Sequence, residues 1–238
     1  MSSPIYVGGS SQGVGKTFVA LGLLYLLRQH YKTAAWKPID VGQLKYHAAD
    51  ILTDGQRLHH AAQMADHPNL VNPFLLNEEL PPVLAARRDG VTLHPATLHQ
   101  YFKMLSTRYE RVVIEGGRGL FMPLTETERE IDLLANWKPE VLWVTQIGER
   151  DLADTLLQIH ALKQAQIAIT GIILSNGNNI KNAELIHYQW LTLEEELSVT
   201  VIALLPFLKS GLEDPAAIGA LLTKNFDKNH LGLFRRIE

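Results

Sequence analysis

Short apolar runs alternate along this chain with longer stretches in which apolar residues recur at helical spacing. Six runs have the length and composition of buried strands, at residues 5–8, 33–36, 111–115, 141–145, 169–174 and 199–204. The intervening pattern predicts helices at residues 18–29, 98–108, 152–164, 181–196 and 214–222. The last of these begins with Asp214-Pro215, an N-cap followed by proline at the first helical position. This alternation predicts an α/β fold with a doubly wound, mostly parallel sheet and helices on both faces.

A glycine-rich segment follows the first predicted strand. We interpret residues 9–17 as a phosphate-binding loop of the type G-x-x-x-x-G-K-[ST], because they lie between a strand and a helix. Glycines let such a loop aim its N–H groups at phosphate, and the helix adds its positive N-terminal end. The residues expected to bind the nucleotide are Gly13, Val14, Gly15, Lys16 and Thr17. The alternative is a turn without a ligand, but the context favours a P-loop NTPase fold that binds a nucleoside triphosphate.

The composition narrows the class of protein further. The 238 residues, 46% of them hydrophobic, suit one α/β domain covering residues 1–238. A net charge of −3 gives no electrostatic reason to expect nucleic acid or an anionic membrane as a partner. The absence of cysteine excludes disulfides, thiolate metal sites and a cysteine nucleophile. The longest apolar run, residues 18–27, is too short to span a bilayer, so we expect a cytoplasmic protein.

Two charged residues stand where predicted strands end. Glu115 closes the run 111–115 and precedes two glycines, a position at which P-loop proteins commonly place an Mg²⁺-binding carboxylate. Lys37 follows the run 33–36, where its charge could stabilise phosphoryl transfer. Asp50, further along, is either a third cation ligand or a surface acid. A solvated role is the alternative for each of the three.

The order of these segments resembles the dethiobiotin synthetases. The match runs from residue 5 to about Pro206 and rests on Trp36-Lys37-Pro38, Asp50, Val71-Asn72-Pro73-Phe74, and residues 115–119 with Pro123-Leu124. The phosphate loop alone is shared with many proteins, whereas the other segments are more specific. The resemblance implies a homodimer that uses ATP, Mg²⁺ and CO₂ to close a ureido ring on 7,8-diaminopelargonate, a step of biotin synthesis.

The same resemblance implies roles for individual residues. Lys16 and Lys37 would be catalytic, Lys16 on the phosphates and Lys37 on the substrate carbamate and the transferring phosphate. The ligands of Mg²⁺ would be Thr17, Asp50 and Glu115. Asn176, or Ser175 if the match slips by one residue, would recognise adenine, with Pro206 also on the nucleotide side.

The resemblance is weakest at segments that would face the substrate. Residues 10–12 are Ser-Ser-Gln where the family has a Thr-Asp-Thr type run, and Val41 replaces a serine. Residues 148–154 differ from the family segment whose backbone binds the substrate carboxylate, and Asp151 is either a helix N-cap or the mark of a different substrate. Arg150 could compensate for the added acids by a charge-assisted hydrogen bond. The candidate substrate residues are Ser10, Val41, Gly117, Arg150 and Asp151.

Other charged segments are interpreted as solvated. These are His59-His60, Arg87-Arg88 and the acidic stretch Glu126, Glu128, Glu130 and Asp132. The proline-rich residues 66–94 are expected to form a long loop or lobe near the site.

Two alternatives to the leading function remain. One is a paralogue with the same fold that acts on another amine, carbamate or carboxylate, and the other is a non-catalytic ATP-binding regulatory protein. Partitioning ATPases carry a lysine where this chain has Ser11, which argues against that branch. The presence of Lys16, Thr17, Lys37 and Glu115 favours catalysis.

Overall fold

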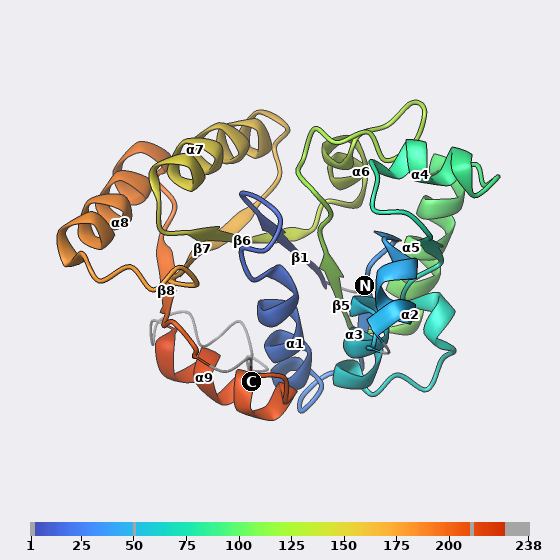
Figure 1. The fold of residues 1–238 in the computed structure, drawn as a ribbon, viewed down its shortest axis with the longest axis horizontal. Helices are drawn as coiled ribbons and strands as arrows, with labels where there is room; N and C mark the ends of the chain where they lie inside the picture. Colours follow the sequence, from blue (N-terminus) through green and yellow to red (C-terminus); the bar gives the residue numbers. More distant parts are fainter. Residues whose placement is uncertain (1–2, 50, 210–211, 227–238) are drawn as a thin grey trace.

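Six parallel strands form the centre of the molecule. The computed structural model describes residues 3–49, 51–209 and 212–226 (Figure 1). The sheet has the order β2-β5-β1-β6-β7-β8, and every pair of neighbouring strands in it is parallel. Its strands are β1 (Ser3–Gly9), β2 (Thr33–Trp36), β5 (Arg111–Glu115), β6 (Glu140–Gln146), β7 (Ile169–Ser175) and β8 (Val201–Leu205). All six were predicted, although β8 begins two residues later than expected because Val199 and Thr200 precede the paired segment.

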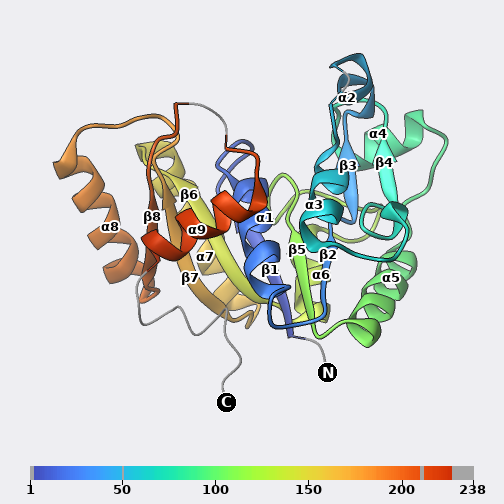
Figure 2. The same cartoon turned by 90° about the horizontal axis from the view of Figure 1, so that it is seen from below.

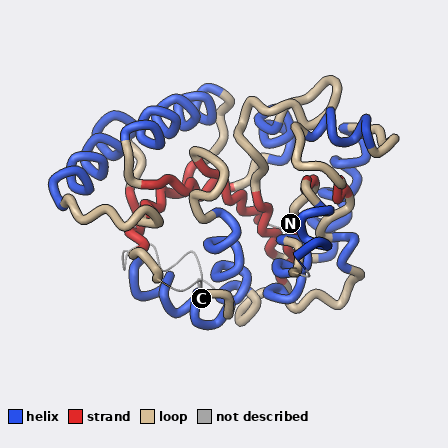
Figure 3. The backbone as a smooth tube through the Cα atoms, in the orientation of Figure 1, coloured by secondary structure: helices blue, strands red, loops and turns tan. Residues whose placement is uncertain are grey.

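Helices cover both faces of this sheet. The first face carries α1 (Lys16–Leu27), which packs on α3 (Asp54–Ala62) and α9 (Pro215–Asn225). The second face carries α5 (Pro95–Arg108), α6 (Glu130–Trp137), α7 (Glu149–Gln164) and α8 (Ala183–Leu197). Figures 1 and 3 show α1 and α9 on one side of the strands and α7 and α8 on the other. The doubly wound α/β prediction is confirmed, and the Asp214 side chain caps α9 by accepting from two backbone N–H groups.

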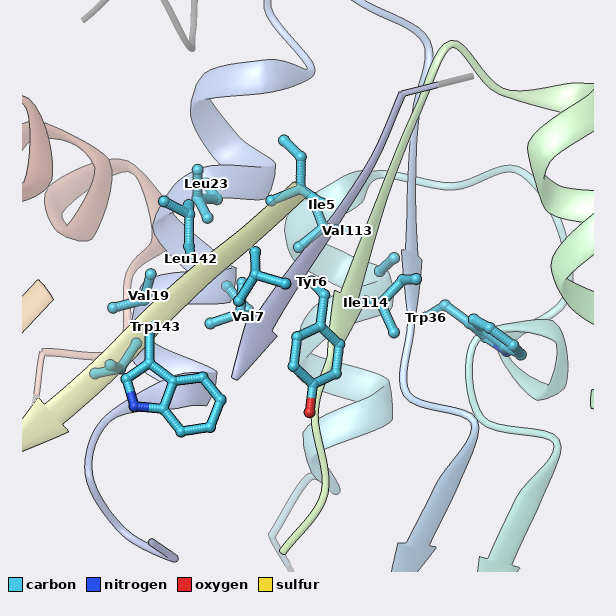
Figure 4. Close-up of a cluster of buried hydrophobic side chains, with 14 of the residues drawn as sticks. Ile5, Tyr6, Val7, Val19, Leu23, Trp36, Val113, Ile114, Leu142 and Trp143 are labelled. Carbon is cyan, nitrogen blue, oxygen red and sulfur yellow. The ribbon is translucent and has the colours of Figure 1, made fainter. Parts of the chain in front are cut away.

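The core follows from the alternation of side chains along β1. Ile5 and Val7 face Leu23 and its neighbours on α1, whereas Tyr6 lies on the opposite side of the sheet with Trp143 (Figure 4). Gly8 shares the side of Tyr6, and a Cβ atom there would lie 2.6 Å from the Trp143 ring. A glycine is therefore needed where β1 leads into the phosphate loop.

A second, smaller unit of structure covers one end of the sheet. Its two parallel strands are β3 (Ile39–Val41) and β4 (Phe74–Leu76), and it includes α2 (Gln43–Ala49), the 3₁₀ turn η1 (Pro68–Leu70) and α4 (Pro82–Arg88) (Figure 2). Residues 66–94, expected to form a long loop or a lobe near the site, form the lobe, because they contain η1, β4 and α4. Strands of three residues are too short for hydrophobic periodicity to reveal. No helix in the described part of the chain is both long and apolar enough to cross a bilayer.

Candidate active site at the carboxyl ends of the strands

The phosphate loop curls between β1 and α1. Gly13 and Gly15 adopt φ values of 81° and 107°, in the left-handed region that side chains disfavour, and Gly15 is the N-cap of α1. Counting back from Lys16 corrects the motif, because Ser10 rather than Gly9 stands at its first glycine position. The loop therefore departs from the strict pattern. Ser10 is buried, and its hydroxyl donates a hydrogen bond to Asp151, so a side-chain contact helps to hold the loop.

Lys16 points its ammonium group back into this loop. Its Nζ atom donates to the Ser11 carbonyl oxygen at 2.7 Å, and the side chain is buried. Burial lowers the pKa of Lys16, while the carboxylate of Glu115 opposes that shift. A triphosphate would offer this ammonium charged acceptors, which bind it more strongly than a neutral carbonyl does.

Lys37 lies at the carboxyl end of β2, buried among three acids. Its Nζ atom is 2.5 Å from Asp54 Oδ2, 3.1 Å from Glu115 Oε1 and 3.5 Å from Asp40 Oδ1. Burial alone would lower the pKa of Lys37, but the carboxylates of Glu115, Asp40 and Asp54 outweigh burial and hold this pKa above its usual value. Lys37 is therefore a fixed positive charge, oriented from three sides.

Burial disfavours the ionised form of two of the acids around Lys37. Burial raises the pKa of Glu115 and of Asp40, and the nearby Lys37 ammonium offsets part of each shift. Glu115 Oε1 also accepts from the Thr17 hydroxyl at 2.8 Å. The second oxygens, Glu115 Oε2 and Asp40 Oδ2, are buried without a hydrogen-bond partner. Such atoms are costly unless a ligand or cation satisfies them.

The residues present fit an Mg²⁺ ion. Thr17, Asp54 and Glu115 supply hard oxygen donors in one pocket with Lys16, and Glu115 Oε2 is free to bind. Within the described ranges, no cluster of three or more His, Cys, Asp or Glu side chains could hold a metal alone. Mg²⁺ commonly takes one or two carboxylates and completes its shell with phosphate oxygens and water, which matches this donor set.

A pocket of about 320 Å³ contains both lysines predicted to be catalytic, together with other predicted site residues. It is lined by Gly13, Gly15, Lys16, Thr17, Lys37, Val41, Glu115 and Gly117, among others. Val14 is buried beneath the loop rather than exposed to the pocket. The predicted metal ligand Asp50 lies outside the described residues, and Asp54 is the acid that reaches Lys37.

The remaining predicted substrate residues lie away from this pocket. Asp151 Oδ1 accepts from the hydroxyls of Ser10 and Ser11, at 2.6 and 3.2 Å, and so ties α7 to the phosphate loop. Of the two alternatives for Asp151, the N-cap is excluded, because Gly148 is the N-cap of α7 and Asp151 belongs to the first turn of this helix. Arg150 is exposed and lies 3.8 Å from Asp154.

The two residues predicted on the adenine side follow β7 and β8. The Asn176 side chain closes its own turn, since Oδ1 accepts from Ile180 N at 2.7 Å and Nδ2 donates to Ile180 O at 2.9 Å. Pro206 is exposed directly after β8. The roles of both residues in adenine binding stay predictions.

Glu130 corrects the prediction of a solvated acidic stretch. Its carboxylate is buried at the start of α6, where Oε1 accepts from the Tyr6 hydroxyl at 2.8 Å and from Gly117 N at 2.7 Å. A Cβ atom at Gly116 would lie 2.3 Å from the Tyr6 hydroxyl oxygen. The turn after β5 thus needs its glycines to pack against this buried pair. Arg87 and Arg88, by contrast, are exposed as predicted, in ion pairs with Glu126 and Glu78.

Sequence reasoning missed Asp54, Asp40 and Tyr46 as pocket residues. A signal for Asp54 was present, since Thr53 and Gln56 form the capping box that begins α3 and fixes the acid in its first turn. Tyr46 faces the same acids, and its burial, with Asp54 and Asp40 nearby, raises its pKa to about 12.

Comparisons with known proteins agree with this geometry. Residues 3–214 match a family model described as an AAA domain. An ATP-dependent dethiobiotin synthetase BioD from Thermodesulfovibrio yellowstonii is 30% identical, over 95% of this chain and 97% of that protein. Another from Anaeromyxobacter dehalogenans is 32% identical, over 72% of this chain and 75% of that protein.

Solved structures of low identity share the fold. The septum site-determining protein MinD from Pyrococcus horikoshii, complexed with Mg-ADP, aligns with a TM-score of 0.60 over the full length of both chains at 20% identity. A ParA family ATPase from Chlorobium tepidum aligns with a TM-score of 0.56 at 11% identity, over 94% of this chain and 91% of that chain. Sequence and fold together lead to one conclusion: the chain belongs to the ATP-dependent dethiobiotin synthetase family.

Proposed function

We propose that this protein is an ATP-dependent cyclo-ligase that closes a ureido ring on 7,8-diaminopelargonate with CO₂, yielding dethiobiotin, ADP and phosphate. The observation that carries the proposal is the Lys37 cluster: a buried ammonium 2.5 Å from Asp54 and 3.1 Å from Glu115. It shares one pocket with Lys16 and Thr17 of the phosphate loop. This arrangement can bring an anionic acceptor and a triphosphate together without repulsion.

The reaction has three steps that need such a site. One amine of the substrate adds to CO₂ and loses a proton, giving a carbamate. A carbamate oxygen attacks the γ-phosphorus of ATP and ADP leaves. The second amine then attacks the carbonyl carbon of the mixed anhydride, expels phosphate, and closes the ring. Lys37 stabilises the negative charge of the carbamate and of the transferring phosphoryl group, and Lys16 holds the phosphates.

ATP and Mg²⁺ are the cofactors that the donor set of the pocket suits. Thr17, Asp54 and Glu115 would hold the ion, and the free Glu115 Oε2 gives it an unsatisfied oxygen. Bound there, Mg²⁺ neutralises phosphate charge. The free Asp40 Oδ2 is suited to accept a hydrogen bond from a substrate amine, beside Val41 and Gly117 in the same pocket.

A homodimer is part of the proposal. Two large apolar side chains lie close together on the surface. Leu157 of α7 is 67% exposed, and Phe121 is 48% exposed. Burying such side chains against a second copy would favour association. Light scattering at micromolar concentration should report a dimer for the native protein and a smaller species for Leu157→Glu; a native monomer would contradict this part of the proposal. We place the enzyme in the cytoplasm, in line with its lack of cysteine.

The product assay tests the function directly. Purified protein with ATP, Mg²⁺, bicarbonate and 7,8-diaminopelargonate should form dethiobiotin detectable by mass spectrometry, and Lys16→Ala should form none. Intact ATP binding with no product would overturn the proposed substrate. It would instead favour one of the two alternatives, a paralogue that acts on another amine, carbamate or carboxylate, or a regulatory ATP-binding protein.

A further inference from the structure

The carboxylate of Glu79 lies between two cationic side chains, Lys45 and Arg118, in this pocket. Glu79 follows β4, and its Oε1 atom accepts from Gln12 Nε2 at 3.2 Å and from Arg118 Nη2 at 3.3 Å. Its Oε2 atom lies 3.9 Å from Lys45 Nζ. The partners come from three separate places: the phosphate loop, α2 and the turn after β5. A single side chain thus links three walls of the pocket.

These contacts are weak enough to exchange. The Glu79 side chain is 43% exposed, and its ion pairs are long, so water and salt screen them. Across the described ranges, no other carboxylate lies within ion-pair distance of Lys45 or Arg118. An incoming anion that displaced Glu79 would therefore meet two cations and an amide donor.

The rest of the pocket describes the molecule that would carry this anion. Lys16, Lys37 and Glu115 provide a polar, charged region for a nucleotide and a reacting polar group. Apolar side chains line the same pocket, namely Ile39, Val41, Pro82 and Leu124. Apolar walls between polar groups are typical of sites that orient a partly aliphatic ligand. The combination suits an aliphatic acid with its carboxylate away from the reacting end.

We propose that Arg118, with Gln12 and Lys45, forms a subsite for the carboxylate at the far end of the acceptor substrate, and that Glu79 occupies this subsite until substrate displaces it. Arg118 is the main element, because a guanidinium binds carboxylate through charge-assisted hydrogen bonds and its side chain is only 27% exposed. The acceptor class is an aliphatic acid, which rests on the proposed function but is tested without turnover.

Binding of a simple probe separates this subsite from the reaction. Nonanoate carries the carboxylate and the chain but no reacting amine, and nonanamide lacks the charge. Both are measured by ligand-observed NMR in the presence of Mg²⁺ and ADP, on the native protein, Glu79→Gln and Arg118→Gln. Glu78→Gln is the matched control, since Glu78 pairs with Arg88 on the surface and does not line the pocket.

Removing the competing carboxylate should tighten nonanoate binding by about three- to tenfold, and removing the guanidinium should weaken it by at least tenfold. Neither change should affect nonanamide, and Glu78→Gln should match the native protein. The subsite is refuted if Arg118→Gln binds nonanoate as the native protein does. It is also refuted if Arg118→Gln weakens ATP binding alone, because the guanidinium then serves phosphate. Dethiobiotin formation is measured in a separate assay. A failure of the proposed function can therefore be distinguished from a failure of the proposed subsite.

Discussion

The active-site pocket holds two carboxylate–cation clusters that differ chiefly in their contact with water. The floor cluster is made of Lys37, Asp40, Asp54 and Glu115, and the mouth cluster of Gln12, Lys45, Glu79 and Arg118. In the floor cluster the ammonium side chain is 9% exposed and its shortest pair is 2.5 Å. In the mouth cluster Lys45 is 71% exposed and its pair is 3.9 Å.

The difference in exposure determines which function each cluster is suited to. Buried charges that lose a partner cannot turn to water, so the floor cluster is held in one arrangement suited to stabilising a transition state. Exposed charges exchange partners at little cost, so the mouth cluster is suited to trading Glu79 for a ligand. The same residue types thus serve fixed catalysis at one end and reversible recognition at the other.

The largest effect is expected at the floor, from Glu115→Gln. The amide keeps the shape but loses the charge that faces Thr17 and Lys37 and that would bind Mg²⁺, so turnover should fall by about 10²- to 10³-fold and more Mg²⁺ should be needed. Steady-state rates across an Mg²⁺ titration measure both. Glu126→Gln, an exposed acid outside the pocket, should behave as the native protein. An unchanged Mg²⁺ requirement in Glu115→Gln would remove Glu115 from the ion's ligands.

The next largest effect is expected on the free energy of unfolding, which should depend on the floor cluster much more than on the mouth cluster. Without Mg²⁺, Lys37→Ala leaves two buried carboxylates, Asp40 and Glu115, and the partly exposed Asp54 without their cation, and it should lower the free energy of unfolding by about 3–5 kcal/mol. Lys45→Ala should change this free energy by no more than about 0.5 kcal/mol, because its pair is exposed. Urea unfolding measures both variants. Equal losses would mean that burial does not distinguish the clusters.

Glu130 differs from the acids of the floor cluster because, in the described part of the chain, this buried acid has no lysine within ion-pair distance. Burial raises its pKa above the usual value for glutamate, although the N–H of Gly117 and the hydroxyl of Tyr6 oppose the shift. Between the usual and the raised pKa, the folded protein holds a proton that the unfolded chain has released. Stability contributed by this proton is therefore lost as pH rises through that window.

The variant Glu130→Gln tests that sign. Because the amide does not titrate, the free energy of unfolding should fall less steeply than in the native protein as the pH rises above the usual pKa of glutamate. Asp40 and Glu115 keep their raised pKa values in both proteins and leave part of the slope in place. Identical slopes in the two proteins would show that Glu130 is ionised throughout.

The smallest effect is expected from Glu79→Gln on stability. Its contacts with Gln12, Lys45 and Arg118 are exposed, so the free energy of unfolding should change by no more than about 0.5 kcal/mol. Any change should disappear at high salt. If urea unfolding showed a loss of several kcal/mol in the free energy of unfolding, the contacts of Glu79 would be needed for the fold and could not be replaced by a ligand.

The sequence predicted the parts of the molecule that depend on local pattern. Long apolar strands and helices carry a periodic signal, and Lys37 and Glu115 were found because each follows such a strand. The small sheet of β3 and β4 carries no such signal in three-residue strands.

Long-range contacts account for what the sequence did not predict. Asp54 reaches Lys37 across 17 residues only because α3 folds back along β2. Glu130 looked solvated because its burial depends on Tyr6, 124 residues away in the chain. A charge pattern read locally cannot report a partner that the fold supplies.

We infer that the buried Lys37 acts in the chemical step and not in nucleotide binding. Lys37→Ala, Lys45→Ala and the native protein are compared at saturating Mg²⁺ and ATP, because a bound cation would offset the charge of the floor-cluster acids that Lys37→Ala leaves unpaired. We expect Lys37→Ala to keep its ATP dissociation constant within about threefold of the native value, while kcat for dethiobiotin formation falls by about 10³-fold or more. Full turnover in Lys37→Ala, or loss of ATP binding together with turnover, would contradict this role of Lys37.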